Sequence, residues 1–237
     1  MREWGARRFW TMAAPRQAGS GFEVTLDGRI LRTPLKSPLV LPTRAMAEAI
    51  ATEWNAQDKD IAPRTMPVTR AANSAVDKVA SQHGAIADML AGYAETDLLC
   101  HRAAEPAVLV ARQAAGWNPV LDWASARYGA ALKVTRGVIP VDQPAEALLV
   151  LRAVVHGFQP FPLTALHDLI TLSGSLILGL AVAEVQLSPE CAWTLARIDE
   201  DWQAEQWGKD MEAAEMAVER QRAFLSAARF LKMSTRI

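Results

Sequence analysis

A stretch near the carboxyl end of the chain, residues 198–219, gathers acids around two tryptophans, Trp202 and Trp207. We call it the acidic tryptophan segment. It contains one base, Lys209, and eight carboxylates: Asp199, Glu200, Asp201, Glu205, Asp210, Glu212, Glu215 and Glu219. Neighbouring carboxylates could act as general acid and base, or could hold Mg²⁺ if their oxygens converged on one point. One hypothesis is therefore a small-molecule enzyme that uses the acids of 199–215 as a general acid/base or magnesium site.

The arrangement of this segment favours a second hypothesis, a protein-binding surface. Its apolar residues recur at three- and four-residue intervals, which predicts helices on both sides of Gly208. Ser188 and Pro189 supply an N-cap and a first-turn proline for the preceding helix. Carboxylates on a surface helix usually stay solvated, which is the wrong environment for catalysis. Tryptophans set among acids are typical of a face that binds another protein.

The rest of the chain offers no catalytic or metal-binding motif. It contains no Walker loop, GxGxxG or HExxH. Residues 172–176 read LSGSL, which misses the GxSxG elbow and lies in an apolar helical run. Cys100 and His101 are adjacent, a poor spacing for ligands of one ion, and the four histidines share no motif. We therefore predict no catalytic residue, no metal ligand and no cofactor, and favour a protein that is not an enzyme.

Composition narrows the class of protein further. The chain has 237 residues and a net charge of −1, which gives no sign of a nucleic-acid or membrane-surface partner. Its two cysteines are far apart, as in a reducing compartment, and residues 1–10 lack the apolar core of a secretory signal. Residues 169–183 are uncharged over fifteen positions, but a membrane span needs roughly 20. We predict a buried core helix there and no membrane insertion.

The amino-terminal part predicts a small β layer. Residues 22–41 are predicted to form strands, because Phe22, Val24 and Leu26 alternate with polar residues and Asp27-Gly28 is a strong signal for a two-residue hairpin turn. Residues 39–41 would add a third strand. The apolar residues of 9–12 would join the layer, because a single hairpin is rarely stable alone.

Beyond that layer the apolar period becomes helical. Helices are predicted at about 43–54, 67–82, 86–93, 108–128, 145–157, 163–173 and 175–185. Pro119 predicts a kink or two separate helices in the fourth of these. Residues 132–138 are a lone strand candidate that could pair with 97–102. The expected fold class is α+β, with an N-terminal β domain at 1–42 and a larger multihelical domain at 43–237.

Seven phrases of the chain, in this order, resemble one protein family. They are FEVTLDGRILRTP (22–34), LPTRAMAEAIATEW (41–54), MPVTRAANSAVDKV (66–79), TDLLCHR (96–102), RQAAGWNPVLDW (112–123), GSLILGLA (174–181) and DEDWQAEQWGKDMEAAE (199–215). The family resembled is that of the F-type ATP synthase assembly chaperones that bind the free α subunit, the Atp-twelve type. The resemblance covers nearly the whole chain; the first twenty residues lack the targeting sequence of mitochondrial members.

The resemblance implies a β domain joined to a helical domain, and a chaperone that keeps unassembled α subunits from aggregating until β subunits take over. It implies a role for acids in the WGxDxEA phrase at 207–213, here Glu212 and Asp210. The expected partner-binding residues are Glu212, Asp210, Trp207, Trp202, Glu205 and Asp199. The expected partner is the ATP synthase α subunit, with no nucleic acid. We expect a monomer when free, located in a bacterial cytoplasm or, alternatively, in the mitochondrial matrix as a mature form.

Overall fold

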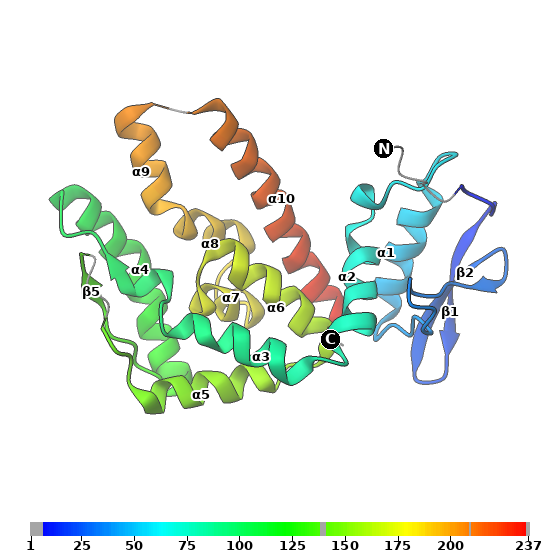
Figure 1. Ribbon diagram of the computed structural model, residues 1–237, viewed down its shortest axis with the longest axis horizontal. Helices are drawn as coiled ribbons and strands as arrows, with labels where there is room; N and C mark the ends of the chain where they lie inside the picture. The colour runs from blue at the N-terminus through cyan, green and yellow to red at the C-terminus, as the bar shows by residue number, and fades with distance from the viewer. Residues whose placement is uncertain (1–6, 138–140, 209, 236–237) are drawn as a thin grey trace. The chain divides into compact units, whose positions relative to one another are not determined.

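The computed structural model describes residues 7–137, 141–208 and 210–235. A small sheet comes first and helices follow, so the expected α+β class is confirmed (Figure 1). The chain forms two compact units. The first takes the described residues within 1–82, 159–165 and 229–237, and the second those within 83–158 and 166–228.

The first unit is built on an antiparallel sheet with the order β1-β2-β3. Its strands are β1 (Ala13–Ala18), β2 (Gly21–Leu26) and β3 (Arg29–Ile30). The predicted hairpin at Asp27-Gly28 is confirmed, with φ of 47° and 84°, the positive values that a type I′ turn requires. The Asp27 carboxylate accepts hydrogen bonds from the N–H groups of Met12 and Thr11, each at 2.8 Å. These bonds lower the pKa of Asp27 and tie the turn to the segment before β1.

Two details of the predicted β layer are wrong. Residues 9–12 precede the sheet, and the strand beside β2 is β1, whose sequence AAPRQA carries no alternating apolar signal. The expected third strand is an isolated bridge between Leu41 and Phe22, with N–O distances of 2.9 and 2.7 Å. Pro38 and Pro42 flank this bridge, and because proline donates no N–H, the ladder stays short.

The helix α1 (Arg44–Asn55) packs on β1 and β2. It begins where predicted, because the Thr43 hydroxyl accepts a bond from the Met46 N–H at 3.2 Å. Met46 and Ile50 lie on its buried side. A 3₁₀ turn, η1 (Pro63–Thr65), follows.

The helix predicted over residues 67–82 consists of α2 (Pro67–Ser74) and a π-helical extension, η2 (Ala75–Val79). The first residues of α2 receive no cap from the residue before the helix. The Glu53 carboxylate on α1 accepts bonds from the N–H groups of Val68 and Thr69 instead, each at 2.8 Å. A carboxylate at a helix N-terminus also interacts favourably with the helix dipole.

The second unit is mainly helical. Helices with residues in this unit are α3 (His83–Ala91), α4 (Ala107–Tyr128), α5 (Ala145–His156), α6 (Pro160–Ser173), α7 (Leu176–Ala183), α8 (Pro189–Ala196), α9 (Ile198–Trp207) and α10 (Met211–Ser234). Two 3₁₀ turns, η3 (Gly92–Ala94) and η4 (Leu98–Cys100), follow α3. Residues 160–165 of α6 and 229–234 of α10 belong to the first unit.

Most of the predicted elements of this unit are confirmed. The helices expected near 145–157, 163–173 and 175–185 are α5, α6 and α7. The two strand candidates pair in parallel as β4 (His101–Arg102) and β5 (Thr135–Arg136); Val138, at the end of one candidate, lies outside the described residues. α4 runs through Pro119 as one helix, so the alternative of two helices is wrong. Buried side chains on both sides of this proline, Trp117 and Val120, anchor the helix across the lost backbone bond.

The apolar run at 169–183 forms the core of this unit, but it is two helices and not one. Gly174 adopts a φ of 73° between α6 and α7, a conformation that glycine reaches without strain. The Ser175 hydroxyl then caps α7 by accepting a bond from the Leu178 N–H at 3.0 Å. A Cβ on Gly179 would lie 2.7 Å from the Ile170 side chain, so α6 and α7 pack closely here. The burial and the break between the helices predicted at 163–173 and 175–185 are confirmed, whereas the expectation of one core helix over 169–183 is wrong.

Asp97 is a fully buried acid that caps η4 and lies against the first turn of α7. Its carboxylate accepts bonds from the Ser175 hydroxyl at 2.8 Å and from the N–H groups of Leu99 and Ile177, each at 3.0 Å. Burial nevertheless raises the pKa of Asp97 to about 6, because removal from water disfavours the charged form more than these bonds favour it. Asp97 therefore joins η4 to α7 inside the core.

No helix in the described parts of the chain combines the length and apolar character that crossing a bilayer requires. The domain boundary expected between residues 42 and 43 falls immediately before α1, and as a domain boundary it stays a prediction.

Candidate functional site

The acidic tryptophan segment folds into α9 and the beginning of α10, as the sequence predicts. The Ser188 hydroxyl caps α8, and Gly208, with a φ of 90°, ends α9. The Asp210 carboxylate accepts bonds from the N–H groups of Glu212 at 2.9 Å and Ala213 at 3.3 Å. Asp210 is therefore an N-cap of α10, a role that its position after a glycine could have suggested.

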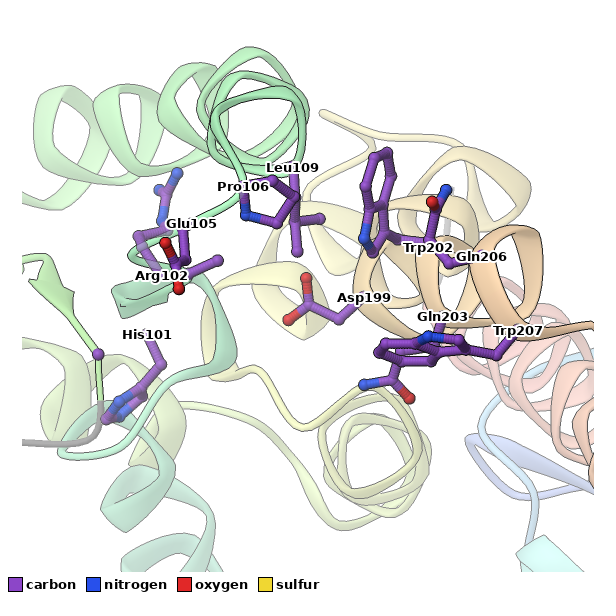
Figure 2. A pocket seen from close by; sticks show the side chains of 12 residues that line it. His101, Arg102, Glu105, Pro106, Leu109, Asp199, Trp202, Gln203, Gln206 and Trp207 are labelled. Carbon is purple, nitrogen blue, oxygen red and sulfur yellow. The ribbon is translucent and has the colours of Figure 1, made fainter.

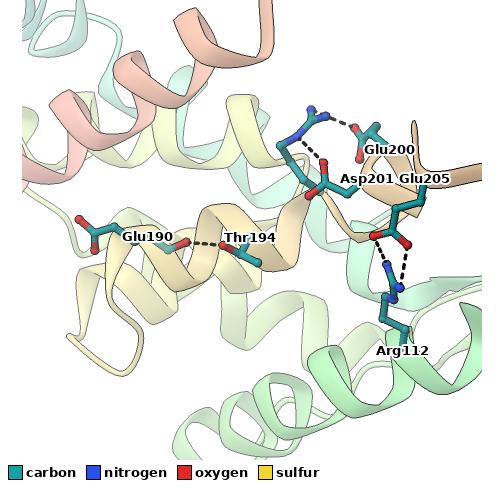
Figure 3. Close-up of polar contacts among 7 residues, drawn as sticks. Arg112, Glu190, Thr194, Glu200, Asp201 and Glu205 are labelled. Atoms are coloured by element: carbon teal, nitrogen blue, oxygen red, sulfur yellow. Dashed lines mark hydrogen bonds and ion pairs between the residues drawn. The ribbon is translucent and has the colours of Figure 1, made fainter. Parts of the chain in front are cut away.

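Two of the residues predicted to bind a partner make contacts within the fold. The Asp199 carboxylate accepts a bond at 2.6 Å from the side-chain amide of Gln113 on α4, a residue only 1% exposed. Glu205 accepts two bonds from the guanidinium of Arg112, at 2.8 and 2.9 Å (Figure 3). These bonds lower the pKa of Glu205. Both acids therefore hold α9 against α4.

The two tryptophans differ in environment. Trp202 is half-buried, and the Arg112 guanidinium lies 5.1 Å from its ring centroid, within cation–π range. Trp207 is 79% exposed. An exposed indole is unusual on a soluble domain, because it leaves a large apolar area in water. Trp207 is therefore the stronger candidate for contact with another molecule.

The first part of α10, residues 211–220, lacks a buried face. All of its side chains are exposed except Ala217, which is half-buried. Three apolar residues here are Met211 (75% exposed), Met216 (58%) and Val218 (45%). Further along the same helix Phe224 is fully buried. Because helices in proteins are stabilised mainly by a packed apolar face, this part of α10 has the character of a surface that another molecule covers.

A groove of about 690 Å³ runs along α8, α9 and this part of α10. We call it the α9–α10 groove. Small residues of α10, Ala213, Ala214 and Ala217, line it beside Trp207. Its charged lining residues are Glu200, Asp201, Asp210, Arg197 and Arg220. Arg197 already pairs with Asp201 at 3.4 Å and with Glu200 at 4.0 Å, as the dashed lines to these acids show in Figure 3.

A second cavity, of about 610 Å³, lies on another side of α9. We call it the tryptophan pocket. One wall is formed by α9 residues that include Asp199, Trp202 and Trp207, and the other by residues 101–109 (Figure 2). Trp207 lines both cavities. The second wall is not predictable from the sequence, because residues 101–109 lie about ninety positions earlier and their local pattern predicts only a strand end and a helix start.

The enzyme hypothesis gains no specific support from this geometry. Within the residues that the structure describes, no three His, Cys, Asp or Glu side chains gather closely enough to hold a metal ion. Asp97 has a raised pKa, but it is enclosed among backbone and hydroxyl donors, where no substrate reaches it. Burial also raises the pKa of Cys100 to about 12, which keeps this thiol protonated and unreactive.

Comparison with known proteins identifies close relatives. The sequence model of the ATP12 chaperone protein family matches residues 7–125. The crystal structure of Atp12 from Paracoccus denitrificans is 52% identical, with a TM-score of 0.95, over 98% of this chain and all of that one. An aspartate-to-lysine variant of P. denitrificans Atp12p matches with 51% identity, the same TM-score and the same coverage. The mitochondrial protein atp12 of Schizosaccharomyces pombe is 22% identical over an alignment of 222 residues that covers 89% of this chain and 76% of that protein.

Proposed function

The chain belongs to the ATP12 chaperone family of ATP synthase assembly, and from this membership we propose that it binds the free α subunit of the F-type ATP synthase. In this proposal it shields the α interface until β subunits replace it. The protein acts by binding, without catalysis or a cofactor, and is a monomer when free. Its site of action is a bacterial cytoplasm or, alternatively, the mitochondrial matrix; relatives come from bacteria and from a mitochondrion.

Physical chemistry explains why such a chaperone is useful. An α subunit without β exposes an apolar surface that is buried in the assembled enzyme, and large exposed apolar patches aggregate. A protein that binds only the unassembled subunit stabilises it by mass action. The chaperone must also dissociate when β arrives. Its interface with α therefore has to exclude water and still release α.

We place the docking surface on the α9–α10 groove and residues 211–220. The observation that supports this most is the helical stretch whose side chains are exposed all round, with Met211, Met216 and Val218 among them. Apolar and aromatic side chains of this kind supply most of the energy of protein interfaces. The groove is lined by small residues of α10, which would let a partner helix approach closely.

The carboxylates of this surface supply charge selectivity. Glu212 is exposed on the first turn of α10, and Asp210 precedes it as the cap. Acids at the rim of an interface favour a partner surface carrying arginine and lysine, and they speed association at low salt. Glu205 and Asp199 would contribute by fixing α9 in place beside Trp202 and Trp207.

The test is co-expression of tagged α subunit with this protein in a strain that lacks β, followed by measurement of soluble α and of the purified complex. Glu212→Lys should abolish or strongly reduce capture of α, most visibly at low salt, because it places like charges against the basic partner surface. Glu146→Lys is the matched control, since Glu146 is also an exposed acid in the first turn of a helix, α5.

The control variant should capture α as the parent does. Equal capture by a folded Glu212→Lys variant would remove Glu212 from the docking surface. Failure of the parent itself to keep α soluble would overturn the proposed function.

A further inference from the structure

The tryptophan pocket brings aromatic and polar side chains of α9 opposite residues 101–109. Asp199, Trp202, Gln203 and Gln206 are spaced along one face of α9 and point to the same cavity. Figure 2 shows the Asp199 carboxylate beside the indoles of Trp202 and Trp207, on the side that faces Glu105 across the pocket.

The charges in the pocket are not balanced. Asp199 uses one carboxylate oxygen to accept the bond from Gln113, which leaves the other oxygen to the pocket. Glu105 is exposed and lies before the start of α4. Two carboxylates thus line a cavity that has one guanidinium, that of Arg102.

Arg102 does not neutralise this excess at the pocket surface. It is 7% exposed, its guanidinium stacks 5.0 Å from the ring centroid of Trp117, and its Nε donates to the Leu99 carbonyl at 2.7 Å. Burial lowers the pKa of Arg102, while the negative charge of Asp199 acts in the opposite direction. Arg102 is therefore held in the pocket wall by Trp117 and Leu99, and the Glu105 carboxylate and the indoles face the open cavity.

Elsewhere in this protein a guanidinium already lies between a carboxylate and an indole. At the edge of α9 the Arg112 guanidinium is held by the carboxylate of Glu205 and lies over the Trp202 ring. A cation in such a position is stabilised by Coulomb attraction to the carboxylate and by interaction with the quadrupole of the indole ring. The tryptophan pocket offers the same two kinds of group, two indoles and two carboxylates, around a cavity of about 610 Å³.

We propose that the tryptophan pocket is a receptor for one cationic side chain, arginine or lysine, of the bound α subunit. This inference rests on the proposed function for the identity of the partner and on the pocket lining for the chemistry. The pocket anchors a single basic residue, while the neighbouring α9–α10 groove covers apolar surface. Trp207 lines both cavities and so links the two contacts.

The first experiment tests the pocket without the partner. N-acetyl-arginine methylamide is titrated into the full chain, and the indole N–H signals are followed by ¹⁵N–¹H NMR, with Trp202 and Trp207 assigned from Trp202→Phe and Trp207→Leu. The arginine probe should shift these two signals, whereas the other indoles serve as internal controls. The citrulline analogue has the same shape without the charge and should not shift them.

Variants sharpen this test. Glu105→Gln and Trp207→Leu should each weaken binding of the arginine probe about 2- to 5-fold, the factor expected for one exposed charge or cation–π contact. Glu95→Gln changes another exposed acid, outside the pocket lining, and should bind as the parent does. An equal response to the citrulline analogue or to N-acetyl-leucine methylamide would make the pocket an apolar site, and no response to any probe would also overturn the proposal.

The second experiment separates this inference from the proposed function. Capture of α subunit is measured for the parent, Glu105→Lys and Glu95→Lys. If Glu105→Lys loses capture of α while the parent and Glu95→Lys retain it, the result supports the pocket as an anchor. If the parent and Glu105→Lys capture α equally, the chaperone function stands and the anchor does not. If the arginine probe binds but the parent does not capture α, the proposed function fails and, with it, the assignment of the basic residue to α.

Discussion

Two helices of the second unit, α7 and α10, begin beside a carboxylate, and the two carboxylates have opposite surroundings. At α7, Asp97 is fully buried and accepts bonds from two N–H groups and a hydroxyl. At α10, Asp210 caps the helix, and Glu212, two residues on, is exposed. Both placements suit the positive end of a helix dipole.

The comparison shows that an acid at a helix start has two different uses. A buried acid, with its oxygens occupied by donors, fixes two segments of the fold in one arrangement, at the cost of removing a charge from water. An exposed acid adds little to stability, and its charge remains available to another molecule. The predictions below measure this contrast, beginning with the change expected to have the largest effect.

The core around α7 should not tolerate a new charge. Leu178→Asp would place an unpaired carboxylate at a fully buried position, with an expected loss of about 3–5 kcal/mol in the free energy of unfolding. Val185→Asp is the control, because Val185 follows α7, is exposed and has a φ of 58° that aspartate adopts more readily than valine. Urea denaturation that gives the Leu178→Asp variant a parent-like midpoint would show that α7 is not core.

Removing the buried carboxylate should have the next largest effect. Asp97→Ala leaves the donors of Leu99, Ser175 and Ile177 without their acceptor, and each unsatisfied buried donor costs about 1–3 kcal/mol. Asp122→Ala removes an exposed acid from α4 and should leave stability unchanged. Similar denaturation curves for the two variants would contradict the role given to Asp97.

The buried acid should also make stability depend on pH. Because the pKa of Asp97 is raised to about 6 from an ordinary value of 3.8, the folded state binds a proton that the unfolded state has released between these values. The contribution of this proton to the free energy of unfolding is complete below about pH 4 and is lost as pH rises through 6. Its size is on the order of 3 kcal/mol. The difference in unfolding free energy between the parent and Asp97→Ala should therefore narrow from pH 4 to pH 7. A constant or widening difference would mean that Asp97 is ionised throughout.

The exposed acid should produce the smallest change in stability. Glu212→Lys reverses an exposed charge on the first turn of α10, so the free energy of unfolding should change by at most about 0.5 kcal/mol. Circular dichroism and the melting temperature should match the parent's. A loss comparable to that of Asp97→Ala would make Glu212 a residue of the fold, and the α7–α10 contrast would disappear.

Much of the local structure was predictable because its causes lie within a few residues. Asp27-Gly28 specifies its turn by backbone conformation, Thr43 and Ser188 specify helix starts through their hydroxyls, and Gly208 specifies an end. The resemblance carried by the seven phrases supplied the family, which the comparisons confirm. The strand β1 was not predictable, because its sequence lacks alternation.

The sequence by itself determined the helices, the caps, the apolar core run and the accumulation of acids around two tryptophans. Only the tertiary structure decided which of these acids serve the fold. Asp199 meets Gln113 across 86 positions and Glu205 meets Arg112 across 93, whereas the side chains of residues 211–220 stay exposed apart from the half-buried Ala217. Helical periodicity reports only which residues share a face, because it arises from backbone geometry within a few turns. Whether that face is covered depends on segments that are distant in the chain and close only after folding.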